Sequence, residues 1–282
     1  YCAEHGAEHD ESFIPGSAWA FGDDFPSFAL LSEDGSIRGV AAGMIGPSFK
    51  AIRRARFAIL HALGEPSVDS YGPLARAVAD AVADAADELY LFHPEVLAGL
   101  HAVLEELGFS FERTSYLMKV EIRDVRPAPF PEGYATEAVS PGDDTSLARF
   151  VTVRNRNFKE VLGSRDARVE DFRDIMESPE NIPGGLIIVC APDGTDCGTL
   201  LLERDEEEYS SFIGTVSIDT AHRRRGIARA LIGKAMIMSK ELGFRQTYLS
   251  VNATNAKALQ LYQREGFKIM KAMSCMTVKV SL

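Results

Sequence analysis

A basic segment directly after a predicted strand carries the strongest chemical signal in the sequence. Strand residues Val216, Ser217 and Ile218 precede it, and a long helix is predicted over residues 224–242. The segment reads Arg223, Arg224, Arg225, Gly226, Ile227, Ala228, Arg229. A helix start leaves about four N–H groups unpaired at the positive end of the helix dipole. The small residues let an anion approach them and the arginines add charge, so the spacing predicts a seat for a pyrophosphate.

This signal is weak on its own. The segment has neither the Gly-Lys-Ser/Thr of a P-loop nor the three spaced glycines of a dinucleotide fingerprint. A basic helix N-terminus that binds no ligand would fit the pattern Arg-x-x-Gly-x-Ala equally well. Further motif residues, at a fixed sequence distance from this segment, are needed to choose between the two interpretations.

If such a seat held a cofactor that carries a thioester, acyl transfer from that thioester to an amine would set three requirements. A base or a water path must take the proton of the amine, and N–H donors must stabilise the developing oxyanion. The strand N–H groups near Ile218 could supply those donors. The thiolate benefits from an acid, and the Tyr262 hydroxyl, with a typical pKa of about 10, suits that task. The alternative for Tyr262 is packing in the core, one turn before Gly266 and Phe267.

The linked motifs resemble the GCN5-related N-acetyltransferase (GNAT) superfamily. Arg223-x-x-Gly226-x-Ala228 opens a long helix, a strand follows, and Asn255-x-x-Ala258 precedes Leu261-Tyr262-x-x-x-Gly266-Phe267. The resemblance covers residues 134–282, and residues 1–126 resemble the same fold in a degenerate form. It implies an α/β fold in which each of two domains has a mixed, mostly antiparallel sheet flanked by helices.

The resemblance also implies a cofactor and residue roles. The acyl donor would be acetyl-coenzyme A, with no metal. Backbone N–H groups of residues 224–229 would bind its pyrophosphate, and residues 216–218 would pair with the pantetheine arm like an added strand. Asn255 would hold the lower part of the cofactor, and Tyr262 would protonate the departing thiolate.

The general base stays open. Relatives place a glutamate where this sequence has Ser250 or Phe212. Glu203, at the end of a predicted hairpin strand, and Asp219, at the end of the cofactor strand, are the candidates. A water chain is equally plausible.

The two halves of the chain resemble each other. Four landmarks recur in the same order: Ile14-Pro15-Gly16 as Ile182-Pro183-Gly184, Asp34-Gly35 as Asp193-Gly194, Gly108-Phe109 as Gly266-Phe267, and Met118 as Met276. This order predicts an internal duplication. We expect a degenerate domain over residues 1–126, a Pro-rich linker over 127–133 and a catalytic domain over 134–282, closed by a strand over 273–280.

The first copy lacks the chemistry. Leu104 stands where the second copy has Tyr262, and no arginine-rich loop precedes its helix near Tyr71. Its acidic residues would repel a phosphate, and it has no counterpart of the opening strand and helices predicted over residues 134–176. We expect the cofactor in the second copy alone.

Composition narrows the class of protein. The 282 residues are 46% hydrophobic and carry a net charge of −11, which argues against a nucleic-acid partner. No apolar run approaches the ~18 residues of a membrane span. Four scattered cysteines favour free thiols and a cytoplasmic location. Positive charge is concentrated after residue 209, in agreement with an anionic ligand there.

The sequence therefore predicts an N-acetyltransferase that acts on a small-molecule amine. The tandem arrangement is similar to that of mycothiol synthases, and a non-catalytic module that binds coenzyme A is the alternative from another class. An acidic run over residues 203–208 favours a cationic acceptor. The identity of the acceptor and the oligomeric state stay open. Asn155, Arg156 and Asn157 end a predicted helix and either contact substrate or form a helix surface.

Overall fold

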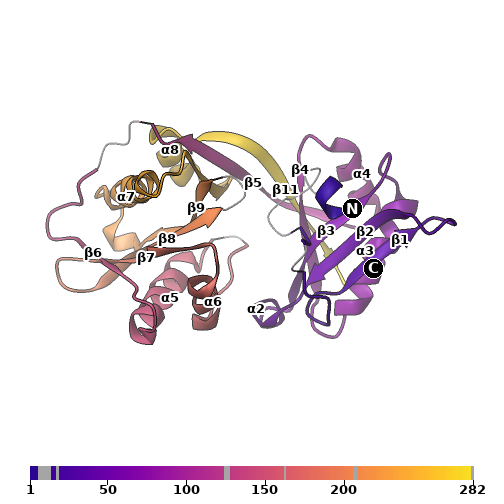
Figure 1. The fold of residues 1–282 in the computed structure, drawn as a ribbon, viewed down its shortest axis with the longest axis horizontal. Coiled ribbons are helices and arrows are strands. Elements are labelled where there is room, and N and C mark those ends of the chain that lie inside the picture. The colour runs from indigo at the N-terminus through magenta and orange to yellow at the C-terminus, as the bar shows by residue number, and fades with distance from the viewer. Residues whose placement is uncertain (6–13, 17–18, 124–127, 162, 206–208, 281–282) are drawn as a thin grey trace. The chain divides into compact units, whose positions relative to one another are not determined.

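The computed structural model divides the chain into two compact units, each with a mixed sheet flanked by helices (Figure 1). Unit 1 comprises Tyr1–Ser115 and Lys271–Leu282, and unit 2 comprises Tyr116–Met270. The structure describes the chain except residues 6–13, 17–18, 124–127, 162, 206–208 and 281–282. No helix of the described residues is long and apolar enough to cross a bilayer.

Unit 2 contains the sheet that carries the predicted site. Its strand order is β5-β10-β9-β8-β7-β6, and among the pairings within β6–β10 only that of β10 with β9 is parallel. The strands are β5 (Ser110–Glu121), β6 (Ala135–Ala138), β7 (Asn181–Cys190), β8 (Asp196–Asp205), β9 (Ser210–Ile218) and β10 (Gln246–Asn252). The predicted hairpin is therefore confirmed as β7 and β8.

Helices cover both faces of this sheet (Figure 1). The helices are α5 (Asp144–Phe158), α6 (Val169–Glu177), α7 (Ile227–Glu241) and α8 (Ala256–Arg264), with a short 3-10 turn η3 (Thr220–His222). Alternation along β8 produces the two layers: Leu200 and Leu202 pack in the core with α7, whereas Leu201 packs in the core with α5 and α6. Every helix predicted in this half of the chain is present.

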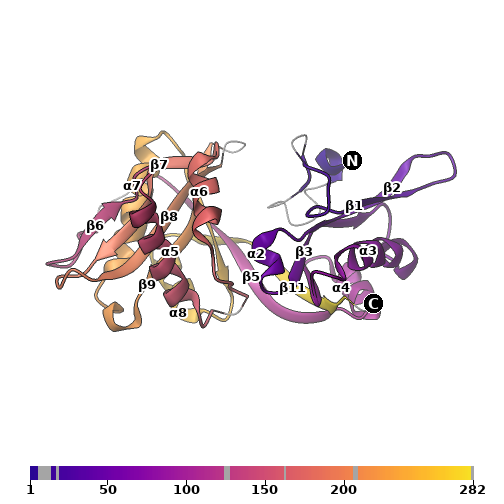
Figure 2. The same ribbon diagram turned by 90° about the horizontal axis from the view of Figure 1, so that it is seen from below.

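Unit 1 has a smaller set of elements. Its strand order is β1-β2-β3-β4-β11. The elements are α1 (Cys2–His5), β1 (Ser27–Leu31), β2 (Ile37–Met44), α2 (Pro47–Lys50), β3 (Arg54–Ala62), α3 (Val68–Val82), β4 (Glu88–Pro94), α4 (Ala98–Glu106) and β11 (Lys268–Lys279). Helices α3 and α4 lie on one face (Figure 2). Cys2 and Trp19 pack against a separate cluster of Ala42, Ala58 and Ile59. Among the described residues nothing corresponds to α5 and α6.

The two halves of the chain exchange strands. β5 follows α4 in the sequence, yet its Met118 is fully buried in the core of unit 2. β11 follows α8, yet Met276 pairs with Leu91 of β4 and is fully buried in the core of unit 1. The predicted pairing of the final strand with the second copy is therefore wrong, because each sheet is completed by the other half's last strand.

The exchange changes the predicted domain boundaries. The units divide at residues 115/116 and 270/271 instead of around a linker at 127–133. Phe130, within the described part of that Pro-rich stretch, packs against the core of unit 2. Residues 124–127 lie outside the described part of the chain.

The repeat is visible in the strand registers. Gly39 pairs with Ala62 in unit 1 as Gly198 pairs with Ile218 in unit 2. Both hairpin turns contain an aspartate that accepts an N–H two residues later, followed by a glycine at φ +83°. The Ile14-Pro15-Gly16 landmark is not part of the repeat, since it lies outside any strand whereas Ile182-Pro183-Gly184 lies within β7.

Candidate active site

Strand β9 parts from β10 halfway along its length. The two strands pair from Ser210 with Gln246 to Ile213 with Leu249, and no further. The register between β8 and β9 shifts at the same point: Leu201 pairs with Thr215 and Leu202 with Ile213, which leaves Gly214 as an extra residue. Such a bulge bends a strand and increases its twist. The second half of β9 therefore keeps β8 on one edge and leaves the other edge open.

Backbone groups at this open edge follow from the antiparallel pattern. Asp219 N–H donates to Cys197 O at 2.7 Å, and opposed residues alternate between bonded and non-bonded pairs. This alternation turns the N–H and C=O groups of Val216 and Ile218 towards the open edge. Ile218 O already accepts from Arg223 Nε at 2.9 Å, so the N–H of Ile218 and both backbone groups of Val216 are left at this edge.

Ser217 differs from Val216 and Ile218, with which it was predicted to bind the cofactor. Its hydroxyl lies 2.7 Å from Thr199 Oγ1 and accepts from Asn157 Nδ2 at 3.0 Å. Its side chain therefore fastens β9 to α5.

The N-terminus of α7 is open. Gly226 is the N-cap residue at φ +88°, and no side chain caps the helix. A Cβ at this position would meet no atom within 4 Å. Ile227 is 1% exposed and anchors the first turn in the core, while Ala228 is half-buried. The helix begins three residues later than predicted because Arg224 and Gly226 both have left-handed φ values.

The arginines of this segment do different things. Arg223 holds the end of β9, and Arg225 Nη1 donates to Tyr134 Oη at 3.1 Å. Arg229 Nε lies 3.0 Å from Glu265 Oε1. Arg224 is exposed and makes no hydrogen bond or ion pair with the described residues. Of the three consecutive arginines, Arg224 is the one left to meet an anion with its side chain.

Helix α8 carries Asn255 and Tyr262. Asn255 is the N-cap residue, and its Oδ1 accepts from Ala258 N at 3.2 Å. The Tyr262 ring packs edge-on against Phe267 with centroids 5.9 Å apart. Burial raises the pKa of Tyr262 to about 12, so the phenol keeps its proton. Its hydroxyl makes no hydrogen bond within the described part of the chain, so the ring is a core residue whose donor is free.

Glu203 lies beside the bulge. Its Oε2 occupies the space that a Cβ on Gly214 would need. Burial, with a smaller contribution from the charge of Glu180, raises the pKa of Glu203 to about 7. A carboxyl that titrates near neutrality can accept a proton from an ammonium or a water. The sequence did not identify Glu180 as a neighbour of Glu203. The available signal for the bulge was Gly214, a glycine inside a strand.

The carboxylate of Asp219 already has an ion-pair partner. Its Oδ1 accepts from Arg156 Nε at 3.0 Å, and Oδ2 accepts from the same guanidinium. This bidentate pair joins the end of α5 to the end of β9 and raises the pKa of Arg156. Of the two predicted bases, Glu203 is therefore the one without a cationic partner among the described residues.

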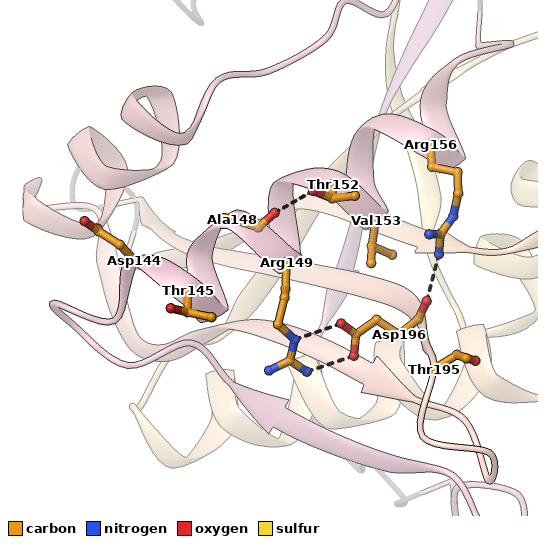
Figure 3. Close-up of a pocket in the computed structure, with 9 residues that line it drawn as sticks. All are labelled: Asp144, Thr145, Ala148, Arg149, Thr152, Val153, Arg156, Thr195 and Asp196. Carbon is orange, nitrogen blue, oxygen red and sulfur yellow. Dashed lines mark hydrogen bonds and ion pairs between the residues drawn. The ribbon is translucent and has the colours of Figure 1, made fainter.

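Unit 2 also has a hollow that does not include Glu203, Tyr262 or the start of α7. It follows α5 and is lined by Asp144, Thr145, Ala148, Arg149, Thr152, Val153, Arg156, Thr195 and Asp196 (Figure 3). Arg149 donates to both Asp196 oxygens at 2.8 Å and to Glu137 at 2.9 and 3.0 Å. These pairs satisfy one another, so the charges here hold α5 on the sheet.

Unit 2 thus combines a bulged strand that parts from its parallel neighbour with a helix whose N-terminus has no side-chain cap among the described residues. Residues 149–267 match the model of the acetyltransferase (GNAT) family. The match lies within unit 2, which therefore has the sequence pattern of this family.

Relatives extend this comparison. A mycothiol acetyltransferase of Propionibacterium freudenreichii subsp. shermanii is 24% identical over 177 residues, or 61% of this chain and 55% of that protein. The chain thus spans about half the length of the curated relatives it matches. A GNAT structure from Sphaerobacter thermophilus has a TM-score of 0.72 at 19% identity, covering 94% of this chain and 83% of that one.

A second solved structure has two GNAT domains. The tandem GNAT protein from the clavulanic acid biosynthesis pathway has a TM-score of 0.67 at 13% identity. It covers 92% of this chain and 83% of that one. These structural likenesses show the fold.

Proposed function

We propose that the chain is an N-acetyltransferase in which unit 2 transfers an acetyl group from acetyl-coenzyme A to the amine of a small molecule. The observation that carries the proposal is the open edge of β9 next to the uncapped N-terminus of α7. The family match of residues 149–267 and the mycothiol acetyltransferase relatives support it. No nucleic acid, membrane or metal is part of the proposal.

The residues present fit the cofactor. A phosphate can reach the first N–H groups of α7, since no cap competes and Gly226 leaves the space in front open. Arg224 and Arg225 add positive charge. Val216 would bond the amide of the pantetheine arm as an added strand would. Asn255 keeps its amide N–H₂ free, because only its oxygen is used in the cap.

The cofactor supplies a thioester. Glu203 would take the proton of the attacking amine, directly or through water, and a pKa of about 7 leaves it partly ionised at neutral pH. Backbone N–H groups at the bulge would donate to the developing oxyanion. Tyr262 would donate its phenolic proton to the departing sulfur. Ser217 would act indirectly, by holding β9 to Asn157.

A thiol-precursor amine is a specific form of the proposal. It is supported by relatives named mycothiol acetyltransferase at 24%, 25% and 26% identity. A module that binds coenzyme A without catalysis is the alternative, and the retained Tyr262 hydroxyl and Glu203 carboxyl argue against it.

The test combines binding with turnover. Coenzyme A should bind one per chain and raise the melting temperature by mass action. An amine library with acetyl-coenzyme A, read by thiol release, should identify an acetylated acceptor. Binding without acetylation of any amine would favour the non-catalytic module, and absence of binding would refute the site.

A further inference from the structure

The C-terminal end of α5 carries a basic cluster that the proposed reaction has not used. We define it as Arg154, Ser164 and Arg165, where the last two lie in the connection to α6. Arg154 Nη1 donates to Arg165 O at 2.5 Å and to Asn155 Oδ1 at 3.0 Å. The guanidinium lies over the ring of Phe158, 4.8 Å from its centroid.

Two polar atoms of the cluster, on Arg154 and Ser164, have no partner among the described residues. Arg154 Nε and Ser164 Oγ are buried and have no hydrogen-bond partner. No carboxylate of the described residues lies within the 4.0 Å of an ion pair from Arg154. Burial, followed by repulsion from Arg165, lowers the pKa of Arg154 against the opposing charges of Asp166 and Asp171. Buried polar atoms in folded proteins nearly always have partners, so these atoms indicate a missing ligand.

Two other arginines of the same helix make the contrast. Arg149 donates to Asp196 and Glu137, and Arg156 donates to Asp219. Both are more exposed than Arg154, yet both have carboxylate partners, so Arg154 is the arginine of α5 that has none among the described residues. Arg154 keeps its Nε edge free because Nη1 is the nitrogen bound to the backbone. That edge is the one that grips a carboxylate with two parallel bonds.

The cluster is close to β9, the strand with the open edge. Asn157 lies three residues after Arg154, on the same side of the helix, and donates to Ser217 of β9. Asn155 clamps the connection in place, since it accepts from Ala167 N at 2.9 Å and donates to Ala167 O at 2.8 Å. One helical turn, about 5 Å, therefore separates the cluster from the contact with the cofactor strand.

We propose that Arg154, assisted by Ser164, binds a carboxylate of the acceptor, so that the acceptor is an amine that also carries a carboxylate. This inference rests on the proposed function and deepens it. It replaces the cationic acceptor expected from the acidic run, of which residues 206–208 lie outside the described chain. Arg154 is then a specificity residue, and Glu203 keeps the proton transfer.

The experiment compares each α-amino acid with its carboxamide at pH 8, with thiol release from acetyl-coenzyme A as the readout. The acid should be preferred in kcat/KM by about ten- to a hundred-fold, the effect of one charge-assisted bidentate pair. Arg154→Gln should remove the preference mainly through KM, Arg154→Lys should restore part of it, and Ser164→Ala should reduce it several-fold. Lys159→Gln, which removes an exposed charge from the same end of α5, should leave it unchanged.

A second measurement needs no turnover. Ligand-observed NMR on the protein saturated with coenzyme A should detect N-acetylated amino acids, the expected products, but not their carboxamides, and Arg154→Gln should abolish the difference. Carboxamides that bind and react as well as acids, or a preference that survives Arg154→Gln in a variant with normal coenzyme A binding, would overturn the proposal. Aminophosphonates that outperform the carboxylates would do so too. Absence of coenzyme A binding would instead refute the proposed function.

Discussion

Units 1 and 2 share a strand architecture. In unit 1, Ala42 pairs with Ile59 and Gly43 with Phe57, so Ala58 is the extra residue where unit 2 has Gly214. The parallel pairing of β3 with β4 stops at Arg56, as that of β9 with β10 stops at Ile213. Both units therefore have a bulged strand with an open edge. This geometry alone does not make a cofactor site.

The units differ at four positions that would contact ligand. Helix α3 is capped by Ser67, whose side chain accepts from Ser70 N at 3.2 Å, whereas α7 has Gly226. Met44 occupies the register position of Glu203, since it pairs with Arg56 as Glu203 pairs with Phe212. The other two are Leu104 for Tyr262 and Leu97 for Asn255. Burial preserves the sheet in both units, while a few side chains determine where chemistry is possible.

The largest expected effect on ligand binding comes from blocking the N-terminus of α7. Gly226→Val should abolish coenzyme A binding, because its branched side chain fills the approach to the N–H groups of α7. At a ligand concentration of 100 Kd the wild type should gain about 2.7 kcal/mol of stability, and the variant none. Calorimetry and thermal shift measure this. Gly243→Val is the matched control, since its φ of +84° and open surroundings impose the same strain at the other end of α7.

Tyr262→Phe tests the second difference. Turnover should fall by roughly ten- to a thousand-fold, as for loss of a general acid, with coenzyme A affinity almost unchanged. Tyr248→Phe removes a hydroxyl that donates to Gln246 in the same unit and should keep turnover. Equal turnover for wild type and Tyr262→Phe would remove this residue from the mechanism.

Glu203→Met places the residue of unit 1 into unit 2. In the wild type, kcat/KM should fall about tenfold per pH unit below pH 7, as the carboxyl is protonated. The variant should lose this limb together with most of the activity. Glu180→Gln should move the limb to lower pH, since the charge of Glu180 raises the pKa of Glu203.

Glu203→Met should also change how the free energy of unfolding depends on pH. The pKa of Glu203 is raised in the folded protein from 4.5 to about 7, so ionisation of this carboxyl opposes folding as pH rises through that window. Glu203→Met should therefore gain stability over the wild type between pH 5 and about pH 8. Chemical denaturation at the two pH values tests the sign, and an equal difference at both would contradict the assigned pKa.

The smallest effects distinguish a cap from a ligand contact. Ser67→Ala and Asn255→Ala should each lower the free energy of unfolding by about 1 kcal/mol, the usual cost of an N-cap. Only Asn255→Ala should also weaken coenzyme A binding. A matching loss of affinity in Ser67→Ala would indicate a ligand in unit 1.

The sequence predicted the elements of unit 2 well because each has a local signal. Apolar periodicity marks α5 and α7, and Gly243 and Gly266 mark helix ends. The uncapped start of α7 was predictable for the same reason, as it depends on consecutive residues. Three features depend on contacts remote in sequence and were not predictable: the exchange of β5 and β11, the ion pair of Asp219 with Arg156, and the environment of Glu203.

The exchange of β5 and β11 has a consequence for synthesis. Met276 belongs to the core of unit 1, yet it is translated after every residue of unit 2. Unit 1 therefore leaves the ribosome with one edge of β4 unpaired, and its sheet can close only when β11 arrives. Domains usually fold in order from the N-terminus as they emerge. Here that order is reversed in part: the half that does not contain the proposed site finishes last, and a truncation after α8 would expose the core of the opposite half.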